Sequence, residues 1–299
     1  TTGTDNVAIG EAALDAVTSG TDNTAVGDNA GGALTTGADN VAIGSGALLV
    51  ATTASNNVAV GTSALTANTS GTDNVAVGDS ALDANTTGGD NTAIGDNALG
   101  ANTTASNNTA VGADALLVNS TGTRNVAVGT YALDANTTAN DNTAVGYNSA
   151  GAITTGVSNT ALGASALLTL TTGSRNTALG YNALTLQTDA SDNTAVGEYA
   201  GGAITTGANN TLVGGKAGDG ITTGGSNTGV GYRALSAPSF TGSNNVGVGT
   251  DALLANTTSP NNVAVGYATL DAQTTGAGYN VAVGYNALTA NTSGTENTA

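Results

Sequence analysis

The chain has 299 residues, of which 45 are glycine, 3% are aromatic and 8% are charged. It contains no cysteine and no histidine, which excludes disulfide bonds, Cys/His zinc sites and catalytic arrangements based on Ser/His/Asp or Cys/His. Its 21 acidic and 4 basic residues give a net charge of −17, which opposes contact with nucleic acid and with anionic membrane surfaces. The sequence has no run of about 18 apolar residues either. We therefore expect a non-enzymatic protein with no nucleic-acid partner and no membrane insertion.

An asparagine recurs every 17 residues from Asn6 to Asn227, and the later steps are 18, 17, 18 and 17 residues, ending at Asn297. Numbering the repeat from this asparagine gives the consensus N-[TV]-A-[VI]-G-x-x-A-L-x-A-x-T-T-G-x-[DN], with glycine at position 5 of every complete repeat. So strict a period indicates a repeat architecture, and we treat residues 1–299 as a single repeat region. The first members of the two invariant columns are Asn6, Asn23, Asn40, Asn57, Asn74 and Asn91 at position 1 and Gly10, Gly27, Gly44, Gly61, Gly78 and Gly95 at position 5.

Within each repeat, positions 2 to 4 alternate Thr/Val, Ala and Val/Ile, which is typical of a short β-strand. The glycine at position 5 ends this strand, and we expect a second short extended segment afterwards, as in residues 64–67. A turn rich in Thr, Gly and Asp/Asn follows, as in residues 69–73. Two strands and two turns predict one coil of a solenoid. The sequence therefore predicts an all-β fold, a parallel β-solenoid or β-roll of about 17 coils, with a two-sided roll favoured because no six-residue sub-period of a triangular helix is present.

Positions 9 and 12 vary together. Position 9 is usually Leu, but four repeats carry a small residue there and a bulky aliphatic residue at position 12, where most other repeats are polar. This exchange predicts that the two positions share one close-packed space. Inheritance of two repeat subtypes by duplication is the alternative explanation. The four pairs are Gly31 with Leu34, Ala150 with Ile153, Gly201 with Ile204, and Gly218 with Ile221.

The direction of the strand side chains bears on assembly. If Ala at position 3 points into the coil, Val/Ile at position 4 and Leu at position 9 would form apolar stripes on the outside, and such stripes mark an interface. A homotrimer would bury them, and we favour this arrangement. If Val and Leu point inward instead, the chain is a monomeric solenoid with an Ala/Thr surface.

Two polar columns are candidates for a structural or binding role. Stacked asparagines at position 1 can pass hydrogen bonds from coil to coil, although asparagine is also a common turn residue. Position 17 carries many aspartates, which repel one another when stacked, and a Ca²⁺ ion could relieve that repulsion. Because Asn, Arg and Ser interrupt this column, a solvated turn face is the favoured interpretation and no cofactor is required. The cation candidates are Asp5, Asp22, Asp39, Asp73 and Asp90.

Threonine pairs at positions 13 and 14 raise the hypothesis of an ice-binding surface. Adjacent residues of a strand point to opposite faces, however, so these pairs do not form a flat threonine array. Several of the same segments, beginning at Asn68, Asn85, Asn102 and Asn136, match the N-glycosylation acceptor pattern, for which turn chemistry is the alternative explanation.

The motifs NTAVGY at 142–147 and NVAVGYNAL at 280–288, with the recurring NTT, resemble repeats of bacterial and phage tail-fibre-domain proteins. More distantly they are similar to the head repeats of trimeric autotransporter adhesins. The coils of this chain are about three residues longer than those of the adhesin heads. The resemblance implies an extracellular, homotrimeric β-roll that serves as a shaft or head.

From these observations we expect a structural shaft or an adhesin-like region of an extracellular fibre, of the phage tail-fibre or bacterial surface-adhesin type, with a cell-surface ligand as a further partner. Both ends fall inside a repeat, so we expect a fragment or processed part of a longer fibre protein. The alternatives are a subunit that stacks end to end into a polymeric cell-surface filament, and a solenoid with an ice- or cation-binding surface.

Overall fold

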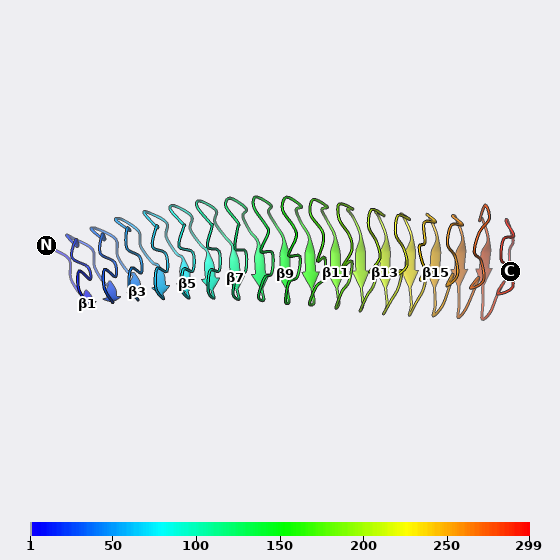
Figure 1. Ribbon diagram of the computed structural model, residues 1–299, viewed down its shortest axis with the longest axis horizontal. Coiled ribbons are helices and arrows are strands. Elements are labelled where there is room, and N and C mark those ends of the chain that lie inside the picture. The colour runs from blue at the N-terminus through cyan, green and yellow to red at the C-terminus, as the bar shows by residue number, and fades with distance from the viewer. Residues whose placement is uncertain (1) are drawn as a thin grey trace. The chain divides into compact units, whose positions relative to one another are not determined.

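The computed structural model describes residues 2–299 and confirms an all-β, parallel β-solenoid of about 16 turns of about 17 residues. Each repeat contributes one three-residue strand. Within each part of the chain, successive strands lie side by side in chain order, with the turns of each coil opposite them (Figure 1). None of the residues described belongs to a helix that is long and apolar enough to span a bilayer.

The chain forms two compact units, Thr1–Tyr147 and Asn148–Ala299, and the same repeat runs through both. We call them the N-terminal unit and the C-terminal unit. The N-terminal unit contains β1 (Val7–Ile9), β2 (Thr24–Val26), β3 (Val41–Ile43), β4 (Val58–Val60), β5 (Val75–Val77), β6 (Thr92–Ile94), β7 (Thr109–Val111), β8 (Val126–Val128) and β9 (Thr143–Val145). The C-terminal unit contains β10 (Thr160–Leu162), β11 (Thr177–Leu179), β12 (Thr194–Val196), β13 (Thr211–Val213), β14 (Thr228–Val230), β15 (Val246–Val248), β16 (Val263–Val265) and β17 (Val281–Val283).

The strands pair in parallel with equal repeat positions opposite one another. In β3 and β4, for example, Ala42 pairs with Ala59 and Ile43 with Val60. Each repeat position therefore becomes a column of stacked side chains along its unit. This register explains why the sequence repeats so strictly, since a one-residue slip would turn every side chain to the other face of the sheet.

The predicted second strand is wrong. Positions 6 to 11 form a series of turns, and Leu65 in this segment has a φ of 52°. The left-handed region costs a non-glycine residue roughly 1–2 kcal/mol, whereas complete burial of a leucine side chain contributes roughly 1.5–3 kcal/mol. Leu65 is fully buried, so the turn brings its side chain into the core. Within each unit the described strands form one sheet, and the expected two-sided roll is corrected to a coil with one sheet face and a turn face.

The core takes one feature from each of the two side-chain arrangements considered. Ala at position 3 points inward, as in the first arrangement, and Leu at position 9 points inward, as in the second. Ala93 at position 3 and Leu99 at position 9 are both fully buried, whereas Ile94 at position 4 is 39% exposed. Ala and Leu therefore point inward together, and of the three columns compared only position 4 faces outward. The expectation that Leu would join an outer stripe is wrong, because the left-handed turn directs it inward.

The exchange between positions 9 and 12 is confirmed as a packing exchange. A Cβ atom placed on Gly31 would lie 3.0 Å from Cδ1 of Leu34 and 2.9 Å from Cδ2 of Leu14. A Cβ on Gly201 would likewise lie 3.1 Å from Cδ1 of Ile204, which is fully buried. The two positions share one space inside the coil. Most repeats place one large aliphatic side chain there, although Leu167 and Leu170, at positions 9 and 12 of one repeat, are both fully buried.

Candidate functional site

The asparagines at position 1 form a hydrogen-bonded ladder. The side-chain amide of Asn74 donates to Oδ1 of Asn57 at 3.2 Å and to the carbonyl oxygen of Gly88 at 2.9 Å. The backbone N–H of Asn74 donates to the same Oδ1 of Asn57 at 3.1 Å. Oδ1 of Asn74 in turn accepts from the backbone N–H and the side-chain amide of Asn91, each at 3.1 Å.

This ladder links each coil to the next through side chains that water does not reach. Asn57, Asn74 and Asn91 are at most 1% exposed, and each uses both its amide group and its carbonyl oxygen. A buried polar group costs free energy unless it is hydrogen-bonded, so these side chains stabilise the coil only as a continuous set. The same bonds join Asn6, Asn23 and Asn40 in the N-terminal unit and Asn193, Asn210, Asn227, Asn245, Asn262 and Asn280 in the C-terminal unit.

A second ladder, which the sequence reasoning missed, runs through position 12. The side-chain amide of Asn85 donates to Oδ1 of Asn68 at 3.0 Å, and that of Asn102 donates to Oδ1 of Asn85 at 2.9 Å. Asn119 and Asn136 continue the ladder, and all five side chains are fully buried. Five consecutive repeats with Asn at one position were the available signal. Because these amides lie inside the coil, the folded chain does not expose the N-glycosylation patterns that begin at Asn68, Asn85, Asn102 and Asn136.

The threonines at position 13 form a third set of links. The hydroxyl of Thr35 donates to the carbonyl oxygen of Thr52 at 3.0 Å, and that of Thr86 donates to the carbonyl oxygen of Thr103 at 2.9 Å. These hydroxyl groups are therefore used between coils. The position-13 threonines hydrogen-bond to the backbone of the next coil. Their neighbours at position 14, such as Thr87, do not make this bond and are exposed.

The glycines at position 5 are required by both backbone angle and space. Gly95 has a φ of 134°, and a Cβ atom on it would lie 2.5 Å from the carbonyl oxygen and 2.6 Å from the carbonyl carbon of Gly112 in the next coil. No side chain fits between the two backbones at this corner. The column therefore sets how closely successive coils approach at the end of each strand.

The aspartates at position 17 lie on an exposed turn face. Asp5, Asp22, Asp39, Asp73 and Asp90 are all exposed, with φ between 58° and 60°. Asparagine and aspartate tolerate this left-handed conformation better than most residues, which accounts for the column without a ligand. Within residues 2–299, no three acidic side chains are grouped closely enough to hold one metal ion.

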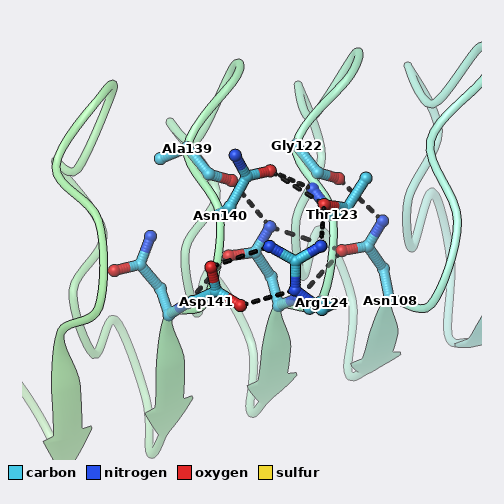
Figure 2. A network of polar contacts seen from close by, with 9 residues as sticks. Asn108, Gly122, Thr123, Arg124, Ala139, Asn140 and Asp141 are labelled. Atoms are coloured by element: carbon cyan, nitrogen blue, oxygen red, sulfur yellow. Dashed lines mark hydrogen bonds and ion pairs between the residues drawn. The ribbon is translucent and has the colours of Figure 1, made fainter.

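Two arginines in the same column pair with the aspartate of the next coil. Nε and Nη2 of Arg124 donate to the two carboxylate oxygens of Asp141 at 2.6 and 2.9 Å (Figure 2). Arg175 and Asp192 repeat this geometry at 2.7 and 2.8 Å. The guanidinium of Arg124 lowers the pKa of the Asp141 carboxyl below its ordinary value, through the hydrogen bond first and charge attraction second.

The outer face of the sheet carries two columns of β-branched and apolar residues. Position 2 is Thr or Val, and position 4, which we call the position-4 stripe, is Val, Ile or Leu. The stripe includes Ile43 and Ile94 in the N-terminal unit and Leu162, Val213 and Val230 in the C-terminal unit, which are 36–47% exposed. It runs through every strand of both units.

Together these features define a β-solenoid repeat protein whose coils are joined by buried asparagine ladders, threonine links and a glycine corner. No protein-family model matches the chain, and comparison with curated protein sequences finds no match.

Proposed function

We propose that the chain is a non-enzymatic structural region, a shaft or adhesin-like display surface, of an extracellular fibre. The observation that supports this role is that every link between coils is repeated, so that the buried polar groups serve cohesion along the solenoid. Buried asparagine amides such as those of Asn74 and Asn91 are saturated by neighbouring coils and leave no group for chemistry. The resemblance of the NTAVGY motif to tail-fibre and adhesin repeats supports the extracellular setting.

We further propose that the fibre is a homotrimer in which the position-4 stripes of three chains pack together. Exposed apolar stripes of this regularity are uncommon on monomeric proteins and mark interfaces. The equal register of successive strands spaces the stripe evenly along the coil axis, so three copies arranged around one axis would present apolar side chains to one another at the same heights.

Light scattering coupled to size-exclusion chromatography tests this assembly. We expect a mass of three times the 28.2 kDa of one chain. The substitution Val111→Lys on the stripe should lower the mass to that of a monomer, whereas Thr104→Lys, at an exposed position 14 of the adjacent coil, should not. A wild-type monomer at every concentration would rule out the trimer, and open polymers seen by electron microscopy would instead support an end-to-end filament.

A second candidate function, ice binding, is favoured by one feature of the C-terminal unit. Thr160, Thr177, Thr194, Thr211 and Thr228 occupy position 2 in five consecutive strands and stand opposite one another in register on the outer face. This array differs from the position-13 threonines, whose hydroxyls are used between coils. Thermal hysteresis of the purified chain should then be lost in Thr194→Lys and retained in Thr206→Lys, and its absence from the wild-type chain would exclude this function.

A further inference from the structure

The regularity of the solenoid is broken at one place in the C-terminal unit, and a pocket lies there. The repeat that begins at Asn227 has 18 residues, and its extra residue falls in a loop over 236–239. Phe240, the only phenylalanine of the chain, is fully buried and its backbone pairs with Ile221, so the core remains filled. The loop residues Ser236 and Pro238, together with the coils on either side, line an open pocket of about 510 Å³. Pockets of roughly 300–1,000 Å³ are the usual size for small ligands.

The pocket collects side chains that are rare in this protein. Lys216, the only lysine, and Arg233 both occupy position 7, in successive coils, and both line the pocket. Adjacent coils are about 4.8 Å apart, so this places two of the four basic residues of a strongly acidic chain beside each other. Like charges this close repel each other. Asp219 and Asp251 offset part of this repulsion, and an anion bound between the two cations would relieve the rest.

These two cations are less well paired than the other two. Arg124 and Arg175 each hold an aspartate at 2.6–2.7 Å. Nε of Arg233 is 3.6 Å from Oδ1 of Asp251, which is too far for a good hydrogen bond. Within the described residues 2–299, Lys216 has no carboxylate within ion-pair distance. Donors of both side chains are therefore free for a ligand.

The remaining walls suit a ring that bears hydroxyl groups. Tyr232 lines the pocket and is 50% exposed, so its ring offers an apolar face beside the two cations. Asp219, Ser236 and Leu254 occupy position 10 in three successive coils and also line the pocket. The hydroxyl of Ser236 donates to the carbonyl oxygen of Lys216 at 2.5 Å, which holds the loop against the preceding coil. Asp219 provides a carboxyl group that can accept from a ligand hydroxyl.

We propose that this pocket binds an acidic sugar, a pyranose ring that carries a carboxylate. The carboxylate would lie between Lys216 and Arg233, where charge-assisted hydrogen bonds are strongest. The apolar face of the ring would stack on Tyr232, and a ring hydroxyl would donate to Asp219. A neutral sugar would leave Lys216 and Arg233 without a hydrogen-bonded anion, and a simple anion would leave the Tyr232 ring uncovered. The site is independent of the proposed structural role, because none of these side chains belongs to the ladders or to the position-4 stripe.

A titration of the purified chain with D-glucuronate, followed by saturation-transfer NMR and calorimetry, tests the site. We expect saturable binding, with affinity for glucose and for acetate lower by about tenfold or more, because each lacks one of the two contacts. Lys216→Gln and Arg233→Gln should each weaken glucuronate binding by about tenfold or more. Arg175→Gln, which removes a paired arginine of the same unit, is the matched control and should not change the affinity.

A second pair of variants tests the stacking contact. Tyr232→Ala should weaken glucuronate binding, whereas Tyr267→Ala, at the same repeat position but outside the pocket, should not. Thermal unfolding of each variant distinguishes a lost contact from a lost fold. Absence of glucuronate binding, equal affinity for acetate, or binding that survives both Lys216→Gln and Arg233→Gln in folded protein would overturn the proposal. None of these outcomes depends on whether the chain forms a trimer.

Discussion

Asn91 donates through its side-chain amide to Oδ1 of Asn74 at 3.1 Å and through its backbone N–H to the same oxygen at 3.1 Å. The side-chain carbonyl group of one coil therefore accepts two hydrogen bonds from the next coil. The amide of Asn91 also donates to the carbonyl oxygen of Ala105 at 2.9 Å, and its Oδ1 accepts from the backbone N–H of Asn108 at 3.0 Å. A single side chain thus satisfies buried groups in three successive coils.

Replacing Asn91 by Ala should therefore destabilise the solenoid by roughly 2–4 kcal/mol, because it removes these bonds and leaves the buried N–H of Asn108 without its acceptor. Urea denaturation followed by circular dichroism measures the loss. Asn107→Gly is the matched control, since Asn107 is exposed and its φ of 64° suits glycine, and it should change stability by no more than about 0.5 kcal/mol. Equal effects of the two substitutions would contradict the ladder as a source of stability.

The glycine corner makes a sharper comparison, because two adjacent glycines differ completely in their surroundings. Gly214 at position 5 has a φ of 135°, and a Cβ on it would lie 2.6 Å from the carbonyl oxygen of Gly231. A Cβ on Gly215 would come no closer than 3.6 Å to the ring of Tyr232. Gly214→Ala should lower the melting temperature strongly or prevent folding, and Gly215→Ala should leave it nearly unchanged. If both variants melt like the wild type, successive coils do not approach this closely.

Packing between positions 9 and 12 can be measured with a double-mutant cycle. Gly31→Leu alone should destabilise the N-terminal unit, because the new side chain needs the space that Leu34 fills. Leu34→Ala alone should destabilise it by leaving a cavity. The double variant should be more stable than the sum of the two effects predicts, with a coupling of roughly 1–3 kcal/mol. Additive effects would mean that the two repeat types reflect descent rather than shared space.

Much of the fold could be predicted from the sequence, because it depends on features that repeat at fixed positions. The strand at positions 2–4 has an alternating pattern, and the covariation of Gly31 with Leu34 indicates a shared space without any structure. The turn at positions 6–11 could not be predicted in the same way, since leucine gives no indication of a left-handed conformation. Leu65 adopts it only because burial inside the coil offsets the strain.

The surroundings of the polar columns also could not be predicted from residue type alone. The position-17 aspartates suggested a cation column, but the left-handed φ at this position also accommodates Arg124 and Ser158. The position-12 asparagines suggested surface acceptors for a glycan, although Asn85 and Asn102 lie inside the coil. In both cases the residue type fitted two environments, and only the three-dimensional position distinguishes them.

Two aspartates of one coil should respond to pH in opposite directions. Burial raises the pKa of the Asp134 carboxyl above its ordinary value of 3.8, whereas the hydrogen bond and charge of Arg124 lower the pKa of Asp141. For Asp134 the folded state binds the proton more tightly than the unfolded state, so its contribution to stability is present below the ordinary pKa and is lost as the pH rises through the raised value. For Asp141 the contribution is present above the ordinary pKa and is lost as the pH falls through the lowered value.

Asp134→Asn and Asp141→Asn convert these contributions into measurable differences in melting temperature. Relative to the wild type, Asp134→Asn should become more stable as the pH rises from about 3 to about 7, because the variant carries no charge to desolvate. Asp141→Asn should become less stable over the same range, because the wild type gains its ion pair with Arg124. High salt should reduce the effect of Asp141→Asn in particular, since this pair is exposed. Parallel pH profiles for the two variants would show that the opposite environments of the two carboxylates do not govern the acid stability of this coil.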